Sequence, residues 1–362
     1  MGKFRFDICI GNPPYQEEGT GEQEKYHPPI YNKFMDNAFE LCNKVMLIHP
    51  ARFLFRAGST PKAWNEKMLA DPHLKVIYYE QNSSEVFPNT DIKGGVAVTY
   101  HDVDKDYGAI DTFTAFAELN SILHKVVVKN PDFQALSDII YGRNIYRFTP
   151  KMHEEHPEAI HLLSKGHAYD LSSNVFDRLG EEFFHEEKPQ DGHSYIKILG
   201  RQNNRRTYRY VREEYITCTG DNLNKWKVFV PKANGTGAIG EVLSTPLLGA
   251  PLLGAPLLGA TETFISIGAF TTKKEAENLL SYVKSKFARA MLGVLKVTQD
   301  NTRDKWLKVP MQDFTDNSDI DWSKPVPEID RQLYKKYGLD ETEISFIEQN
   351  VREMDCCDDT SD

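Results

Sequence analysis

The tetrapeptide Asn12-Pro13-Pro14-Tyr15 combines residue types that can activate an exocyclic aromatic amine. Such an amine is a poor nucleophile because its lone pair is delocalised into the ring. The side-chain oxygen of Asn12 and the backbone carbonyl of Pro13 can accept hydrogen bonds from the two amine hydrogens. The prolines stiffen the loop and remove competing N–H donors, while the Tyr15 ring can stack on a planar substrate. If a sulfonium methyl group is held in line, positioning provides most of the rate, and no general base of unusual pKa is required.

Alternating strands and helices surround this tetrapeptide. The apolar run from Phe4 to Ile10 ends at Gly11 and predicts a buried strand. The spacing over 28–42 predicts a helix whose apolar face includes Phe34 and Leu41. Further strands are expected over 45–48, 74–79 and 96–100, with a short helix over 61–69. The fold class is therefore α/β, with a parallel or mixed sheet in a doubly wound layer. A different interpretation of the tetrapeptide is a proline-rich turn in which Tyr15 only packs.

The stretch from Phe6 to Gln16 resembles motif IV of the gamma-class N6-adenine DNA methyltransferases of type II restriction–modification systems. The segment Glu85-Val86-Phe87-Pro88, followed by the strand at 95–100, resembles their motif VIII. The resemblance implies a partial Rossmann-like methyltransferase sheet with Asn12, Pro13, Pro14 and Tyr15 as its catalytic loop. It also implies that Tyr15 and Phe87 stack on the two faces of a flipped adenine. Alternatively, Phe87 is an ordinary core residue beside a proline turn.

The second half of the chain resembles a TaqI-like specificity domain, a mixed α+β target-recognition domain. The segments that carry this resemblance are 139–144, 226–232, 261–264, 309–314 and 333–339. We therefore expect a partial methyltransferase domain over 1–118, a helical connector over 119–135 and a target-recognition domain over 136–323. Helices over 324–354 and an acidic tail over 355–362 complete the expected organisation. A long helix is predicted over 272–293.

Two basic stretches suit contact with duplex DNA. The net charge of −10 and the pI near 5.6 argue mildly against nucleic acid, but the local distribution of charge matters more. The first stretch interleaves tyrosines with basic residues, and the second follows the predicted helix. The candidate DNA-binding residues are Lys197, Arg201, Arg205, Arg206, Arg209 and Arg212 in the first stretch, and Arg303 and Lys305 in the second. Alternatively, the first stretch is a solvated basic hairpin and the second an ordinary helix-to-strand connection.

The segment from Pro246 to Ala260 repeats the unit Pro-Leu-Leu-Gly-Ala three times. Three units rich in proline and glycine are too few to build a solenoid. We expect a loop lengthened by tandem duplication, because loop insertions cost little. The alternative is a variable spacer that changes how recognition elements sit on DNA.

The resemblance implies S-adenosylmethionine as the methyl donor, bound before motif IV by a glycine-rich turn and an acidic residue. Only eleven residues precede Asn12 here. We therefore expect this half to be missing from the chain and leave the cofactor-binding residues unassigned. The chain would then be a fragment from a truncated gene, the product of a late start site in a longer frame, or a subunit completed by a second polypeptide. An exposed sheet edge and apolar face, with poor solubility or a partner, should follow. The segment Gly235–Gly240 fits GxGxxG, but that pattern alone is weak.

Other features narrow the function classes. No apolar run approaches the roughly 18 residues of a membrane span, and the cysteines show no metal-binding spacing. We expect a cytoplasmic protein with reduced thiols and no metal for methyl transfer. Three alternatives stay open: a non-catalytic DNA-specificity module, a glutamine or RNA methyltransferase, and a fused nuclease at Asp177, Glu186 and Lys188.

Overall fold

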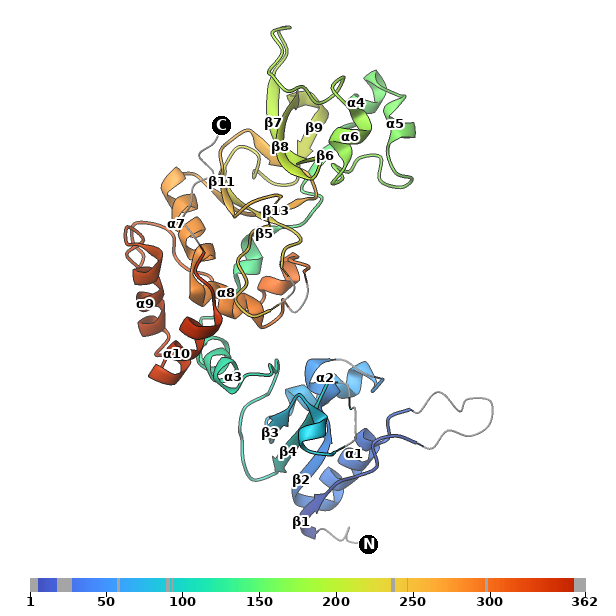
Figure 1. The fold of residues 1–362 in the computed structure, drawn as a ribbon, viewed down its shortest axis with the longest axis vertical. Coiled ribbons are helices and arrows are strands. Elements are labelled where there is room, and N and C mark those ends of the chain that lie inside the picture. The colour runs from blue at the N-terminus through green and yellow to red at the C-terminus, as the bar shows by residue number, and fades with distance from the viewer. Residues whose placement is uncertain are drawn as a thin grey trace, which may run out of the picture. The chain divides into compact units, whose positions relative to one another are not determined.

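The computed structural model describes residues 6–17, 28–56, 59–88, 92, 94–235, 238–245, 247–296 and 299–354. The chain divides into two compact units, Met1–Asn120 (unit 1) and Ser121–Asp362 (unit 2), which are described separately (Figure 1). The acidic tail lies outside the described residues.

Unit 1 contains a four-stranded mixed sheet in the order β1-β2-β4-β3. Strands β1 (Phe6–Gly11) and β2 (Cys42–Pro50) are parallel, with helix α1 (Tyr31–Leu41) between them in the chain. Strand β4 (Val96–Asp102) is antiparallel to both β2 and β3 (Leu74–Glu80). Helix α2 (Lys62–Ala70) precedes β3. The expectation of a parallel or mixed α/β sheet is met by a mixed one.

The core of unit 1 lies between β2 and the helices. Val45 and Leu47 of β2 are buried with Met35 of α1 and Met68 of α2. Helix α1 packs on β2 because parallel neighbours need a crossover that returns the chain to the start of the next strand. This core fixes the sheet end from which the tetrapeptide emerges.

The predictions of a buried first strand and of the apolar face of the first helix are wrong in part. Phe6, Ile8 and Ile10 of β1 are 61%, 61% and 73% exposed, and Phe34 and Leu41 of α1 are also exposed. Among the described strands β1 pairs with β2 alone, so it forms an edge. An apolar strand becomes fully buried only when layers cover both faces and neighbours flank both sides. The expected exposed apolar edge is present.

Unit 2 is built on three small sheets. The first has the order β11-β10-β13-β5, the second β12-β7-β8, and the third pairs β6 with β9. Their bounds are β5 (Ile140–Tyr141), β6 (Tyr146–Phe148), β7 (Tyr195–Gln202), β8 (Arg205–Arg212), β9 (Ile216–Cys218), β10 (Trp226–Pro231), β11 (Leu252–Gly254), β12 (Leu258–Ala260) and β13 (Phe264–Phe270). This mixture of short strands and helices agrees with a mixed α+β unit.

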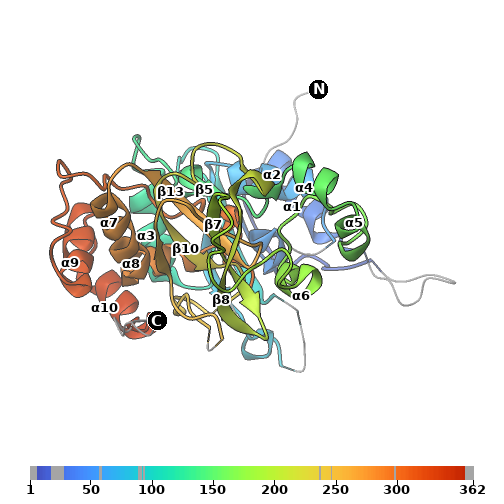
Figure 2. The same ribbon diagram turned by 90° about the horizontal axis from the view of Figure 1, so that it is seen from above.

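The helices of unit 2 form two groups. Short helices α4 (Pro150–Glu155), α5 (Ala159–Leu162) and α6 (Val175–Leu179) lie beside strands β6 to β9 (Figure 1). Helices α7, α8, α9 and α10 gather together, as Figures 1 and 2 both show. Their bounds are Lys273–Lys284, Lys286–Gly293, Val326–Lys336 and Glu341–Asn350; α3 (Ala117–Leu123) continues into one π-helical turn at His124–Val128.

The single helix predicted over 272–293 is broken at Ser285. Ser285 adopts an extended conformation, and its hydroxyl accepts a hydrogen bond from the Ala288 N–H at 3.1 Å. The residue therefore caps a second helix rather than continuing the first, as serine often does at an N-cap. The apolar periodicity was right for both helices but could not show the cap between them.

The prediction that the pentapeptide repeat is a loop is wrong for its second and third units. The first unit makes a turn at Thr245 and Gly249, the second forms β11 on β10, and the third forms β12 on β7. A Cβ atom at Gly254 would lie 2.6 Å from Phe229, and one at Gly259 would lie 2.9 Å from Ile198. The glycine of the repeat thus permits close packing in two different sheets.

Candidate functional site

The carboxyl ends of three strands of unit 1 lie at the same end of the sheet. Gly11 ends β1 opposite Leu47, and Pro50 ends β2 opposite Val96, the first residue of β4. Glu80, the last residue of β3, also pairs with Val96. The loops that follow β1, β2 and β3 therefore converge here, and ligands of α/β sheets commonly bind outside the carboxyl ends of strands.

The predicted catalytic tetrapeptide lies directly after β1 at this sheet end. Asn12 and Pro14 are exposed, and Pro13 and Tyr15 are half-buried. The Tyr15 carbonyl accepts a hydrogen bond from the Ile30 N–H at 3.1 Å, just before α1 begins. The tetrapeptide is thus held between the end of β1 and the start of α1, with the Asn12 side chain open to solvent.

The structure brings Tyr15 and Phe87 together, although they are far apart in the sequence. Their ring centroids are 6.4 Å apart with an interplanar angle of 64°. A planar base between two rings needs about 7 Å, from two contacts of roughly 3.5 Å each. The rings would have to part slightly and rotate toward parallel to hold one. The Phe87 N–H donates to the Ser83 carbonyl at 2.8 Å, so the loop that carries this ring is folded back on itself.

The Tyr15 hydroxyl is buried and forms no hydrogen bond to the described residues. Burial raises the pKa of this hydroxyl, and the nearby Asn12 side chain lowers the same pKa in part. Tyr15 is therefore neutral at ordinary pH and presents a ring rather than a charge. A neutral aromatic surface suits stacking more than acid–base chemistry.

His49, which no sequence pattern singled out, is fully buried near the end of β2. Its Nε2 lies 2.8 Å from the Thr99 hydroxyl, and its ring stacks on Tyr31 with centroids 5.8 Å apart. Burial lowers the pKa of His49 to about 4, so the ring is neutral at physiological pH. The sequence feature that could have indicated this buried residue is a histidine at the end of an apolar strand, directly before Pro50.

At the same sheet end, the requirement for glycine at position 95 was also not predicted from the sequence. The φ of Gly95 is +80°, and a Cβ atom there would lie 2.3 Å from the Glu80 carbonyl oxygen. The Gly95 carbonyl accepts a hydrogen bond from the Ala51 N–H at 3.0 Å. Only glycine fits this close approach, which ties the segment before β4 to the segment after β2.

The first basic stretch forms the hairpin β7–β8. Its two-residue turn places Asn203 and Asn204 at positive φ, as a tight hairpin turn requires. Strand alternation divides the six basic residues between the two faces. Lys197, Arg201, Arg206 and Arg212 share one face, and Arg205 and Arg209 lie on the other.

Several of these cations bind the protein itself. Arg206 donates to the carbonyls of Leu248 and Ala250 at 2.6 and 2.7 Å, and Arg209 pairs with Glu186 at 2.7 Å. Arg212 pairs with Glu155 and Glu214 at 3.4 and 3.8 Å.

The remaining hairpin cations are less engaged. Lys197 lies over the rings of Tyr208 and Tyr210, with its Nζ 5.1 and 5.4 Å from their centroids. Arg201 and Arg205 make no side-chain hydrogen bond or ion pair within the described residues. The hairpin therefore has at most three basic side chains that remain available to a ligand.

The second basic stretch is also engaged in part. Arg303 donates to the Ser137 carbonyl at 2.8 Å, and Lys305 pairs with Asp304 at 3.1 Å. Both lie in or beside a 3-10 helix over Arg303–Trp306. This segment is connected to the start of β5 through Ser137, so its cations support the fold as well as facing solvent.

The glycine pattern at 235–240 falls partly outside the described residues, because Thr236 and Gly237 are not placed. At its end, the Gly240 carbonyl accepts a hydrogen bond from the buried Arg289 side chain at 3.0 Å. A Cβ atom at Gly240 would lie 2.4 Å from Val351. This end of the segment packs inside unit 2.

Within the placed part of the chain, no group of three or more His, Cys, Asp or Glu side chains could hold a metal ion. Of the residues considered for a nuclease, Asp177 is exposed on α6 and Glu186 pairs with Arg209. Among the helices that the structure describes, none is long and apolar enough to cross a membrane.

Comparison with known proteins points to the same region of unit 1. The family model of the Eco57I restriction-modification methylase matches residues 1–87, which include the tetrapeptide and Phe87. An uncharacterized adenine-specific methylase of Mycoplasma pneumoniae is 32% identical over 98 residues, or 26% of this chain and 23% of that protein. The match thus spans less than a quarter of the length of that relative. The N-terminal part of the chain therefore resembles a restriction-modification methylase.

Two solved structures show weaker similarity. The type IIG restriction endonuclease BpuSI gives a TM-score of 0.31 at 11% identity, covering 88% of this chain and 48% of that chain. The type IIL restriction-modification enzyme MmeI, solved in complex with DNA, gives 0.35 at 9% identity, covering 95% and 56%. Both TM-scores are too low to establish a shared fold.

Proposed function

We propose that this chain acts in a site-specific DNA methyltransferase that transfers a methyl group from S-adenosylmethionine to the exocyclic amine of adenine in duplex DNA. The enzyme would belong to a restriction–modification system of the gamma class. The observation that carries the proposal is the juxtaposition of Tyr15 and Phe87 beside Asn12 at one sheet end. The match of the methylase family model to residues 1–87 supports it.

The proposed chemistry depends on hydrogen-bond acceptors placed beside a stacking surface. The Asn12 side-chain oxygen and the Pro13 carbonyl accept the two amine hydrogens, which holds the nitrogen lone pair away from the ring. Tyr15 and Phe87 hold the flipped base and offset part of the cost of unstacking it, a few kcal/mol. S-adenosylmethionine supplies an electrophilic methyl group on its sulfonium when bound. The amine proton is released to water, and no metal is needed.

The described strand ends of unit 1 do not fit the cofactor pocket that the resemblance implies. Strand β2 is followed by a 3-10 helix over Ala51–Phe55, and β1 by the tetrapeptide, with no glycine-rich turn that leads into a helix. We propose that a cofactor-binding half, on a second polypeptide, pairs with the open edge of β1. The exposed Phe6, Ile8 and Ile10 favour such a neighbour, because burying them would release apolar surface from water.

Unit 2 is proposed as the DNA-specificity part of the enzyme. Lys197, Arg201 and Arg205 are the hairpin residues best placed to contact DNA, since their charges are not consumed by ion pairs in the described residues. Arg206, Arg209, Arg212, Arg303 and Lys305 are proposed mainly as supports for the fold of unit 2. Phosphate contacts would position the unit, and fewer contacts to bases would specify the sequence.

The decisive test is Asn12→Ala in the active enzyme, assembled with the polypeptide that carries the cofactor half. Loss of a preorganised acceptor should lower incorporation of labelled methyl groups into duplex DNA by about 10²- to 10³-fold. Binding of DNA in a mobility-shift assay should be unchanged. The matched control is Gln16→Ala, which removes an exposed amide next to the tetrapeptide. Retained methylation by the Asn12 variant would rule out the assigned role of the loop.

Calorimetric titration of S-adenosylmethionine into the chain, with and without duplex DNA, tests where the cofactor binds. Absence of binding by a chain that still shifts DNA supports a separate cofactor half. Micromolar binding by the chain alone would contradict that part of the proposal and place the cofactor site within these 362 residues.

A further inference from the structure

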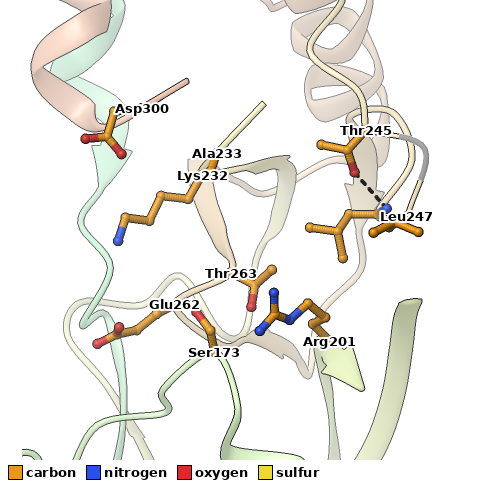
Figure 3. Close-up of a pocket in the computed structure, with 10 residues that line it drawn as sticks. Ser173, Arg201, Lys232, Ala233, Thr245, Leu247, Glu262, Thr263 and Asp300 are labelled. Carbon is orange, nitrogen blue, oxygen red and sulfur yellow. Dashed lines mark hydrogen bonds between the residues drawn. The ribbon is translucent and has the colours of Figure 1, made fainter. Parts of the chain in front are cut away.

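Unit 2 contains a pocket of about 310 Å³ where several of its strands meet (Figure 3). Arg201 of β7 enters from one side, and Lys232, which follows β10, enters from another. Glu262 and Thr263, which precede β13, form part of its floor with Ser173. The turn of the first pentapeptide unit contributes a wall through Leu247 and Leu248.

The backbone that carries these side chains is held by hydrogen bonds that continue the β10–β13 and β7–β12 pairings, and by one to Leu171. The Lys232 N–H donates to the Thr263 carbonyl at 2.9 Å, and the Glu262 N–H donates to the Leu171 carbonyl at 2.8 Å. The Thr261 N–H donates to the Leu199 carbonyl of β7, also at 2.8 Å. The pocket is therefore built on fixed strand ends, which hold side chains more accurately than free loops do.

Three of the four charged side chains that line the pocket have no partner among the described residues, and the fourth, Asp300, makes an interaction. Arg201, Lys232 and Glu262 are partly buried, yet within the described residues their side chains form no hydrogen bond or ion pair. Neighbouring cations on the same hairpin, such as Arg206 and Arg209, are satisfied by protein groups. Partial burial of an unpaired charge is unfavourable, so these three groups are suited to a ligand that completes them.

The mixture of signs limits the chemistry of that ligand. A phosphate offers acceptors to Arg201 and Lys232, but Glu262 would repel it. A base pair presents acceptors and a donor on one edge. In the major groove, guanine shows O6 and N7 as acceptors, and its partner cytosine shows the N4 amine as a donor. Arginine and a carboxylate are the side chains that complement these two edges.

We propose that this pocket reads one G·C base pair of duplex DNA, with Arg201 facing the guanine and Glu262 facing the cytosine. The inference rests on the proposed function, since it assigns base recognition to the specificity part of the same enzyme. An A·T pair would set the thymine O4 acceptor against the Glu262 carboxylate, which leaves two acceptors facing one another.

The test is selection of binding sequences from a library of random duplexes with the complete chain. The wild-type chain should enrich a motif that contains an invariant G·C position. Glu262→Gln and Arg201→Gln should each lose preference at that same position, by roughly tenfold, while other positions are unchanged. Arg201→Lys keeps the charge but loses the paired donors, so it should bind with nearly normal affinity and reduced preference at that position.

The matched control is Arg205→Gln, which removes one exposed charge from the opposite face of the same hairpin. It should weaken binding to all duplexes alike and leave the motif unchanged. Thermal unfolding by circular dichroism confirms that each variant is folded, and Glu262→Gln keeps the shape of the side chain.

The outcomes separate this inference from the function on which it rests. A wild-type motif that survives unchanged in the Arg201 and Glu262 variants would overturn the pocket assignment and leave DNA recognition intact. A change at an A·T position, or a uniform loss of affinity that marks a phosphate site, would overturn it as well. No enrichment and no duplex binding by the wild-type chain would reject the proposed function itself, and the pocket assignment with it.

Discussion

In unit 1 the residues proposed for chemistry converge on one sheet end, whereas in unit 2 the basic residues of the hairpin are divided between two faces. Tyr15 and Phe87 come from separate loops and meet with ring centroids 6.4 Å apart. Arg205 and Arg206 are neighbours in the chain, yet one is exposed and the other holds the carbonyls of Leu248 and Ala250.

The difference follows from how each region places a side chain. In unit 1 the carboxyl ends of β1, β2 and β3 lie at the same end of the sheet, so the loops that follow these strands lie close together. Along a strand, successive side chains point to opposite faces, so a run of arginines cannot form one surface. A strand rich in basic residues can therefore contain some side chains that contact a ligand and others that only stabilise the fold.

The largest effect expected from this comparison is the response of the two units to loss of one pentapeptide. The three units are identical, so deleting any one of them gives the same sequence. The remaining two cannot fill the turn, β11 and β12 together. Unit 2 should lose more than about 4 kcal/mol of unfolding free energy, and unit 1 should be unaffected.

Hydrogen exchange measured separately for β2 and β10 checks this prediction, because each strand reports on one unit. Leu247→Ala is the control, since this side chain of the repeat is 53% exposed and its loss should change stability by less than about 0.5 kcal/mol. If the deletion leaves hydrogen exchange in β10 unchanged, the repeat does not stabilise unit 2, and the spacer interpretation is favoured.

The sheet of unit 1 could be predicted because its signals are local. The strands around 45–48, 74–79 and 96–100 are short apolar runs, and each lies within an observed strand. The meeting of Tyr15 and Phe87 was expected through the family resemblance, not through periodicity. Their roles in binding a base stay predictions, as do those of Asn12 and the prolines.

The features that sequence could not reveal depend on contacts distant in the chain. The same five residues form a turn and two strands, because each copy meets a different neighbour: β10 for one and β7 for another. The unpaired state of Arg201 and Glu262 likewise depends on how three strand ends meet. Composition identified the basic stretch but could not show which charges were already paired.

A smaller expected effect is a difference between the two units in how their stability depends on pH. Burial lowers the pKa of His49 from 6.5 to about 4, so the unfolded chain binds a proton more readily than the folded one. The stability that His49 contributes is complete above about pH 6.5 and is lost as the pH falls toward 4. Between about pH 7 and pH 5 unit 1 should lose about 2 kcal/mol.

The measurement is hydrogen exchange in β2 across this pH range, for wild type and His49→Gln. The variant keeps a polar side chain but has no titrating group, so its unfolding free energy should change less with pH. Exchange in β10 of unit 2 is the internal control, because it should not respond to the substitution. Parallel pH profiles of wild type and variant in β2 would show that other groups govern the acid sensitivity of unit 1.

The smallest effect separates the two faces of the hairpin through its adjacent arginines. Arg206→Gln removes charge-assisted hydrogen bonds to Leu248 and Ala250, so it should lower the unfolding free energy of unit 2 by about 1.5–3 kcal/mol. Arg205→Gln should change stability by less than about 0.5 kcal/mol but reduce the slope of log affinity against log salt by about 1. Chemical denaturation and DNA binding at several salt concentrations measure the two quantities. If both variants reduce the salt slope equally, the hairpin acts as one charged surface, and Arg206 contacts DNA despite its bonds to the repeat.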